Sequence, residues 1–259
     1  MPEMLEIEAY RRAAEPIVGR TVRGVHAPDE WYAKGDTSTE QLRTVLPGVT
    51  ITGLRRIGKL MLIDTDGPVL GLRYGMTGRI LVDDVAPIEA LEYSSDRNDP
   101  AWDRFGIVFC GGGSLMIRDP RRLGGVELDP DESKLGPDAG AVSRALFGKI
   151  VLGSAAPLKA RLMDQSKLAG LGNLLVDETL FRAGLAPDRV ANSLEDDEIA
   201  RLHRAMRRTI TVLGKRGGSH TGDLQPARIR GGTCPNDGTE LVRADVGGRT
   251  TYWCPQHQT

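Results

Sequence analysis

A change in the spacing of apolar residues near Lys134 is the feature that most constrains the fold of this chain. Before Lys134, short β-branched runs are separated by turn signals such as DG, GGG and DP, a pattern typical of strands. After it, apolar residues recur every three or four positions, which is the period of an amphipathic helix. The sequence therefore predicts an α+β protein with a strand-rich first half and a helical second half.

The first half is expected to form an N-terminal β-sandwich with one helix at its start. That helix is expected over residues 6–18, and a smaller one is expected to follow Thr37-Ser38-Thr39-Glu40. Many short strands at close spacing are typical of two packed sheets. The expected strands are residues 21–25, 49–54, 60–64, 69–72, 79–82, 107–110, 114–117 and 125–128.

The second half is expected to consist of helices followed by a small hairpin. The apolar period predicts helices in residues 157–165 and 171–184, the second closed by Gly184. A long helix is expected to open at Ser193, with Asp196 three residues later as its capping partner. The sequence predicts three domains: a β-sandwich at 1–133, a helical domain at 134–224 and a β-hairpin at 225–259.

Charge is distributed unevenly along the chain. The formal net charge is −1, yet residues 199–259 carry 10 Lys and Arg against 4 Asp and Glu. Binding to nucleic-acid phosphates requires such a basic segment. A solvated basic helix face explains the charge equally well, so charge alone leaves both interpretations open.

The start of the chain and its cysteines indicate a cytoplasmic (bacterial) or a nuclear protein with no membrane partner. The segment MPEMLEIEAY carries carboxylates from its third residue and has no apolar stretch, so neither a secretory signal nor a membrane anchor is expected. Three cysteines are too few for a disulfide framework, which leaves metal binding or burial as their uses. Cys110, between Phe109 and a glycine run, is expected to be a small buried hydrophobe.

The C-terminal tail has the spacing of a metal site. Cys234-x-x-Asp237 and Cys254-x-x-His257 are separated by the length of a hairpin. Two thiolates, one imidazole and one carboxylate can close a tetrahedral zinc on two such knuckles. The sequence predicts one structural zinc, with a metal-free hairpin as the alternative. Asp237 is the weakest ligand, because zinc usually meets cysteine at this position.

Six segments in order resemble the formamidopyrimidine-DNA glycosylase and endonuclease VIII family over nearly the whole chain. They are MPEMLEIEAYRR, RRIGKLMLI, RYGMTGRI, DPRRLG, the stretch LKARLMDQSKLAGLGNLLVDETLFRAGLAP, and Arg249 placed five residues before Cys254. The long stretch is similar to the family's helix-two-turn-helix. The resemblance implies a base-excision repair glycosylase that is also an abasic-site (AP) lyase and removes oxidised or ring-opened bases. It further implies a zinc finger with one structural zinc. The implied partner is double-stranded DNA that contains damaged bases or abasic sites. The protein is expected to be a monomer that acts in the bacterial cytoplasm, at the nucleoid.

The resemblance also implies the site residues. The start of the chain and the lysine strand carry the catalytic residues. Two wedge loops, the helix-two-turn-helix and the finger carry the DNA-binding residues, and the two knuckles carry the zinc ligands. The catalytic residues are Pro2, Glu3, Glu6 and Lys59; the DNA-binding residues are Met76, Arg121, Leu123, Lys159, Asn173, Glu178 and Arg249; the metal ligands are Cys234, Asp237, Cys254 and His257.

The chemistry of the first residues supports this assignment. Once Met1 is removed, Pro2 offers a secondary amine whose unperturbed pKa is about 8, so a fraction is neutral and nucleophilic near pH 7. Glu3 beside it can pass protons to the sugar. Pro2 could instead merely start the chain, with Glu3 and Glu6 complementing a helix N-terminus. In the same way, Met76 could be a core residue beside a turn and Leu123 a strand residue.

Four positions depart from the family's pattern. Leu123 stands where the formamidopyrimidine branch usually has Phe, Leu5 replaces a proline, and Asp237 and His257 replace two zinc-binding cysteines. In addition, the segment GGSHTGDLQPAR is short where members carry a longer loop over the flipped 8-oxoguanine. We therefore expect abasic sites and oxidised pyrimidines to be processed at least as well as 8-oxoguanine.

Two other functions are compatible with parts of the sequence. A catalytically inactive protein on the same fold could bind damaged DNA, although such a binder has no need of a terminal amine. An RNA-associated zinc-ribbon protein would account for the basic tail but leaves the N-terminal half unexplained.

Overall fold

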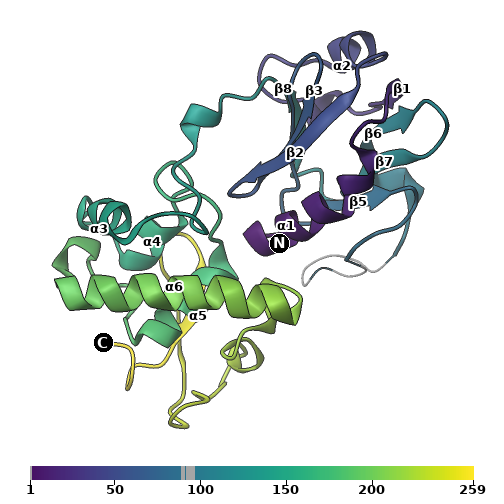
Figure 1. Cartoon of the computed structure of the whole chain (residues 1–259). Coiled ribbons are helices and arrows are strands. Elements are labelled where there is room, and N and C mark those ends of the chain that lie inside the picture. The colour runs from purple at the N-terminus through teal and green to yellow at the C-terminus, as the bar shows by residue number, and fades with distance from the viewer. Residues whose placement is uncertain (1, 89–90, 92–96) are drawn as a thin grey trace. The chain divides into compact units, whose positions relative to one another are not determined.

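The computed structural model of the chain describes residues 2–88, 91 and 97–259 (Figure 1). The chain divides into two compact units, an N-terminal unit of Met1–Glu132 and a C-terminal unit of Ser133–Thr259. The N-terminal unit is built on sheets and the C-terminal unit on helices with a terminal hairpin. The predicted α+β class is therefore confirmed.

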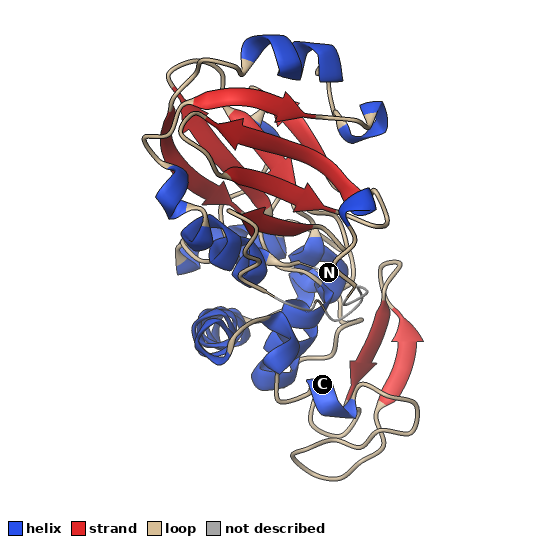
Figure 2. Ribbon diagram, turned by 90° about the vertical axis from the view of Figure 1, so that its right-hand side faces the viewer, coloured by secondary structure: helices blue, strands red, loops and turns tan. Residues whose placement is uncertain are grey.

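Antiparallel strands form two four-stranded sheets in the described part of the N-terminal unit, and Figure 2 shows them packed as layers. One sheet has the order β1 (Val22–His26), β6 (Asp103–Phe109), β7 (Ser114–Arg118), β5 (Arg79–Val82). The other has the order β2 (Ile51–Ile57), β3 (Leu60–Thr65), β4 (Leu70–Arg73), β8 (Gly125–Leu128). Side chains of both sheets, including Ile63, Leu72, Phe105 and Ile117, form one buried apolar core. This is the expected β-sandwich.

The helices of the N-terminal unit are short. They are α1 (Met4–Ala13), α2 (Thr39–Val45) and the 3-10 turns η1 (Glu15–Ile17), η2 (Glu30–Tyr32) and η3 (Pro100–Trp102). The first helix begins two residues earlier than predicted, because Glu3 and Glu6 form a capping box at its start. It also ends earlier, at Ala13, and Pro16 lies in the 3-10 turn that follows. Helix α1 packs against β2 and β3.

The C-terminal unit contains α3 (Arg144–Leu152), α4 (Leu158–Met163), α5 (Asn173–Ala183) and α6 (Asp196–Arg216). Its 3-10 turns are η4 (Glu132–Lys134, which starts at the unit boundary), η5 (Ala191–Ser193), η6 (Ser219–Thr221) and η7 (Gln225–Ala227). The hairpin consists of β9 (Val242–Asp245) and β10 (Thr250–Trp253). Helix α5 is central, since α4, α6 and β10 all pack against it (Figure 1).

In the C-terminal unit one helix start was predicted wrongly and one helix was missed. The long helix opens at Glu195, whose side chain forms a capping box with Glu198, and Ser193 lies in the preceding 3-10 turn. The carboxylate of Glu198 accepts a 2.9 Å hydrogen bond from the Glu195 amide, so the true cap lies two residues later. Helix α3 was not predicted.

Within the described residues, no helix has the length and apolar character needed to cross a membrane.

Candidate active site and nucleic-acid interface

The start of α1 places three predicted catalytic residues at one helix N-terminus. Glu3 is the N-cap residue, and its amide donates a 2.8 Å hydrogen bond to the Glu6 carboxylate. The Glu3 side chain accepts in return from the Glu6 amide. Pro2, directly before this box, is buried, and the exposed fraction of Glu3 is 0%. Glu6 thus has a structural function as a cap, while Glu3 is fixed beside the residue that would carry the amine.

Lys59 lies in the two-residue turn between β2 and β3, where Ile57 pairs with Leu60. Gly58 occupies the left-handed region (φ 57°), which allows so tight a turn. The turn is tied to α1 by Arg56, which donates to the Gly58 carbonyl at 2.7 Å and to the Glu8 carboxylate at 3.3 Å. The predicted lysine is therefore held on the strand pair that packs against α1.

The two predicted wedge loops contact each other. Gly75, beside Met76, lies so close to Leu123 that a Cβ at Gly75 would stand 2.4 Å from the Leu123 carbonyl carbon. The φ of Gly75 is +55°, a second reason for glycine at this position. Met76 is half-buried, whereas Leu123 is 50% exposed and Arg121 is also exposed. The alternative that Leu123 is a strand residue does not hold, since β8 begins at Gly125.

Asp119, which the sequence patterns did not single out, organises these loops. Its fully buried carboxylate accepts hydrogen bonds from the Thr77 hydroxyl at 2.5 Å and from the Gly124 amide at 2.8 Å. It also accepts from the Arg121 amide at 3.3 Å and the Tyr32 hydroxyl at 3.4 Å. The Asp-Pro pair within DPRRLG was a signal for such a turn. A buried carboxylate with this many donors fixes both loops in one arrangement.

In the C-terminal unit, Asn173 and Arg249 are brought together by the hairpin strand β10. Asn173 is the first residue of α5, and its side-chain amide donates to the Thr250 carbonyl at 3.3 Å. Arg249, next to Thr250 at the hairpin turn, is exposed. The Asn173 Oδ1 is buried and has no hydrogen-bond partner among the described residues. A helix N-terminus and an exposed arginine side by side form a suitable phosphate contact.

Lys159 departs from the prediction that it contacts DNA, because its side chain is 0% exposed. Its Nζ lies 2.7 Å from the Asp177 carboxylate, which is also paired with Arg228. It also donates to the Thr251 hydroxyl at 2.7 Å, and that hydroxyl donates to the Arg249 carbonyl at 2.9 Å. Burial raises the pKa of Asp177, and the two cations act in the opposite direction. Lys159 thus holds the hairpin turn that carries Arg249.

Glu178 is likewise buried and acts inside the unit. Its carboxylate accepts from the amides of Asp223 and Leu224, both at 3.0 Å, and from Arg182 at 2.7 Å. These amides belong to the short GGSHTGDLQPAR segment. Glu178 therefore fastens this segment to α5, a role that spacing alone did not reveal.

The predicted metal ligands lie together at the base of the hairpin. Cys234, Asp237, Cys254 and His257 each offer one donor atom, and these four atoms lie within 4.8 Å of one another. Nε2 of His257 lies 3.1 Å from the Phe181 carbonyl, which can only accept, so this nitrogen carries the hydrogen and Nδ1 is left for a metal. Phe181, Leu224 and Leu241 pack around the two thiols.

The donor set fits a tetrahedral zinc. Hydrogen bonds from Thr239 lower the pKa of the Asp237 carboxyl to about 2, so it is ionised and available as a ligand. Burial raises the pKa of the Cys234 thiol, a cost that a bound cation would offset. Bound there, zinc would cross-link the two knuckles.

Cys110 is exposed, which contradicts the prediction that it is buried.

Comparisons with known proteins agree with these features. The family model described as the formamidopyrimidine-DNA glycosylase N-terminal domain matches residues 1–126, and that enzyme's H2TH domain model matches residues 135–223. The formamidopyrimidine-DNA glycosylase of Geobacillus kaustophilus is 34% identical, with 100% of both chains covered. That of Xanthomonas campestris pv. campestris (strain B100) is 33% identical, with 98% of both chains covered.

Solved structures of a Lactococcus lactis enzyme are also similar over the full length. Its complex with an abasic site containing DNA has a TM-score of 0.83 and 28% identity, and 100% of each chain is covered. The LlFpg complex with a THF-DNA and an inhibitor has a TM-score of 0.83 and 29% identity, again with 100% of each chain covered. The residues, the fold and these relatives together show that the chain belongs to the formamidopyrimidine-DNA glycosylase family and is a DNA repair glycosylase.

Proposed function

We propose that this glycosylase is also an abasic-site lyase and that both activities use the amine of Pro2. The observation that carries the proposal is the capping box, which fixes the Glu3 carboxylate directly after Pro2 at the N-terminus of α1. The positive end of a helix disfavours a protonated amine beside it, so the neutral nucleophile is favoured. The box thus supplies a nucleophile and a proton carrier in adjacent residues.

The proposed reaction proceeds in balanced steps. The Pro2 nitrogen bonds to C1′ of the damaged nucleotide, and the bond from C1′ to the base breaks. The electron pair of that bond leaves with the base, which takes up the proton that the nitrogen loses. Glu3 then gives a proton to the ring oxygen, the sugar opens and the nitrogen lone pair forms an iminium. Loss of a proton from C2′ expels the 3′ phosphate, and a second elimination expels the 5′ phosphate. Phosphates remain at both ends of the gap.

Other residues are proposed to hold the DNA. Lys59, Asn173 and Arg249 bind phosphates of the damaged strand, an assignment supported by the exposed Arg249 beside the start of α5. Met76, Arg121 and Leu123 fill the stack vacated by the flipped base, supported by the contact between their loops. Zinc at the hairpin keeps Arg249 in place. The enzyme acts as a three-domain monomer in the bacterial cytoplasm.

The substrate range follows from the segment GGSHTGDLQPAR. Glu178 ties this segment to α5, so little chain is left to enclose a flipped purine. We infer that abasic sites, 5-hydroxyuracil and 8-oxoguanine are processed at comparable rates or with 8-oxoguanine slowest. Single-turnover rates on the three duplexes test this, and a strong preference for 8-oxoguanine opposite cytosine would contradict it.

Borohydride trapping on an abasic-site duplex tests the Pro2 imine, because hydride reduces an iminium to a stable covalent adduct. The protein is prepared with a cleavable N-terminal tag and compared before and after cleavage to a free Pro2. Adduct is expected only after cleavage, with DNA binding the same in both forms. Equal trapping by the tagged protein refutes the proposal. Binding without any adduct in either form would instead indicate the catalytically inactive DNA-binding protein.

A further inference from the structure

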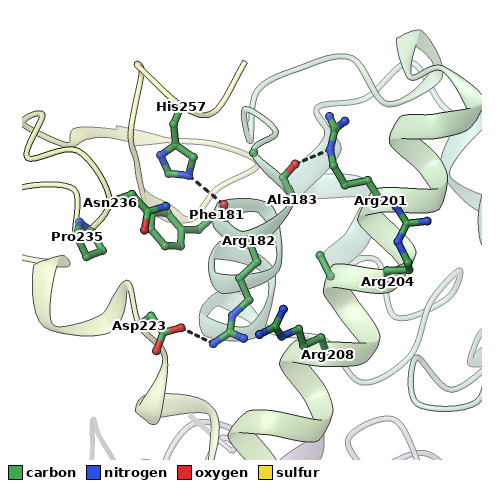
Figure 3. Close-up of a pocket in the computed structure, with 12 residues that line it drawn as sticks. Phe181, Arg182, Ala183, Arg201, Arg204, Arg208, Asp223, Pro235, Asn236 and His257 are labelled. Atoms are coloured by element: carbon green, nitrogen blue, oxygen red, sulfur yellow. Dashed lines mark hydrogen bonds and ion pairs between the residues drawn. The ribbon is translucent and has the colours of Figure 1, made fainter.

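A hollow of about 740 Å³ lies in the C-terminal unit, at the C-terminal end of α5 (Figure 3). Arg182 of α5 and three arginines of α6, Arg201, Arg204 and Arg208, line it. The knuckle residue Asn236 closes one side, as Figure 3 shows. Of the residues that line it, His257 alone has a role proposed above, as a zinc ligand. Its volume lies within the range of small-molecule sites, about 300–1,000 Å³.

The charges of the hollow are only partly neutralised. Arg182 is paired with Glu178 at 2.7 Å and with Asp223 at 2.6 Å. Asp223 is shared with Arg216, which lowers the pKa of its carboxyl and keeps it ionised. Arg204 and Arg208 are exposed and make no hydrogen bond or ion pair with any residue that the structure describes. The hollow therefore has an excess of positive charge from guanidinium groups that are free to bind a ligand.

Groups that would repel an anion are already occupied. The C-terminal end of a helix presents carbonyl groups and a partial negative charge. In α5, however, the Ala183 carbonyl accepts from Arg201 at 2.8 Å and the Phe181 carbonyl accepts from His257. Both contacts are drawn in Figure 3. These two carbonyl groups therefore already have donors, and Asp223, the carboxylate of the lining, is paired with Arg182 and Arg216.

The hollow is separate from the predicted phosphate contact at Asn173. That residue begins α5 and Ala183 ends it, so the two ends lie about 15 Å apart at 1.5 Å per residue. Arg201 and Arg208 are seven residues apart on α6, or about 10 Å along the helix axis. Several guanidinium groups within this short distance suit a compact ligand with clustered phosphates, because guanidinium binds phosphate oxygens in a bidentate manner.

We propose that this hollow is a binding site for a compact polyphosphate, the di- or triphosphate group of inorganic polyphosphates and nucleotides. Arg204 and Arg208 bind the phosphate oxygens, and Arg182 and Arg201 add positive charge from the walls. The site is independent of the proposed lyase reaction and of its residues.

Calorimetric titration of inorganic triphosphate into the whole protein tests this site. The double variant Arg204→Ala/Arg208→Ala is expected to bind at least about tenfold more weakly, because it loses two charge-assisted contacts. Arg207→Ala is the control: it removes one positive charge from an exposed position of α6 that does not line the hollow. It is expected to bind as the wild type does. Equal thermal melting of all three proteins excludes misfolding as the cause.

A further titration, with a nucleoside triphosphate, identifies the source of the phosphates. A nucleoside triphosphate that binds as tightly as triphosphate, or more tightly, supports the site and shows whether its base and sugar contribute. Three results refute it: no binding of triphosphate, whether or not a polyglutamate peptide binds, an equal loss in Arg207→Ala, or displacement of triphosphate by an abasic-site duplex. The last would assign the hollow to the DNA interface.

Discussion

The two units hold their predicted functional residues in different ways. In the N-terminal unit, one apolar core between two sheets supports the fold, and residues such as Leu123 and Arg121 project from loops outside it. In the C-terminal unit, the hairpin that carries Arg249 is attached through buried charges and thiols, with Lys159 and Asp177 only 0% and 1% exposed. A buried charge is costly once its partner is lost, whereas an exposed side chain can be removed cheaply. Substitutions of the exposed wedge-loop residues Arg121 and Leu123 should therefore affect activity alone, whereas substitutions at the buried attachment of the hairpin should affect stability as well.

The largest effect is expected from Cys254→Ser, which removes a buried ligand of the proposed zinc. Zinc contributes about 10–16 kcal/mol to the folding of zinc-finger peptides near pH 7, so the hairpin should unfold locally. We expect bound zinc to fall from one per chain to none and DNA affinity to fall at least about tenfold. Elemental analysis and fluorescence of Trp253, the only tryptophan of the C-terminal unit, measure the two structural effects.

Cys110→Ser is the matched control, because it is the same substitution at an exposed cysteine of the other unit. It should leave zinc content, Trp253 fluorescence and DNA binding unchanged. Unchelated wild-type protein without zinc would contradict the metal site, and an intact hairpin in the zinc-free variant would contradict its structural role.

The next largest effect is expected from Asp177→Asn. The substitution preserves shape but leaves Lys159 and Arg228 buried without a counter-charge, which costs about 3–5 kcal/mol. The connection from Lys159 through Thr251 to Arg249 should loosen, so DNA binding should weaken too. Urea unfolding followed by Trp253 fluorescence, with Trp31 and Trp102 replaced by Phe, measures the stability of the C-terminal unit.

Asp223→Asn provides the comparison for this measurement. Asp223 also pairs with two arginines, but its side chain is 47% exposed, so its loss should cost less than about 1 kcal/mol. Equal losses in the two variants would show that burial does not distinguish these ion pairs.

A smaller effect on stability, with a clear effect on activity, is expected from Leu123→Ala in the N-terminal unit. Half of this side chain is already exposed, so the free energy of unfolding should change by less than about 1 kcal/mol. Excision from duplex DNA should slow about tenfold, since the flipped state loses its wedge. Single-turnover excision on duplex DNA measures this loss. Val85→Ala, at another exposed apolar residue of the unit, should change neither property. A large loss of stability in Leu123→Ala would break the contrast between the units.

The smallest expected effect is the pH dependence of stability that comes from one surface ion pair of the N-terminal unit. Arg55 donates two 2.6 Å hydrogen bonds to Glu132 and lowers the pKa of that carboxyl below 4.5. As pH falls, the Glu132 carboxyl is protonated in the unfolded chain before it is protonated in the folded one. The pair therefore stabilises the fold above about pH 4.5, and this stabilisation is lost as pH falls through the lower folded pKa. Both side chains are more than a third exposed, which limits the effect to less than about 1 kcal/mol.

Urea midpoints of the wild type and Glu132→Gln at pH 7 and pH 3 measure this contribution. The wild type should be slightly more stable at pH 7, and the difference should be smaller at pH 3. A difference of the same size at both values would mean that the charge of Glu132 contributes nothing.

Local patterns in the sequence predicted much of the fold. Alternation of apolar residues located most strands, and the Cys-x-x-Asp and Cys-x-x-His spacings located the metal cluster, because both depend on neighbours within a few residues. Helix α3 was missed, and the opening of α6 was placed at Ser193 instead of Glu195. Several adjacent acidic residues could cap this helix, and in the structure Glu198 accepts from the Glu195 amide and pairs with Arg189 from outside the helix.

The sequence by itself determined the α+β class, the family and the candidate residues, since each follows from residue types at fixed spacing. Only the tertiary structure decided what Lys159, Glu178 and Asp119 do. All three are polar residues that a sequence places at a surface by default, and all three are buried by contacts with segments far along the chain. Burial makes their hydrogen bonds obligatory, and those bonds turn them into residues that position the hairpin, the short segment and the wedge loops.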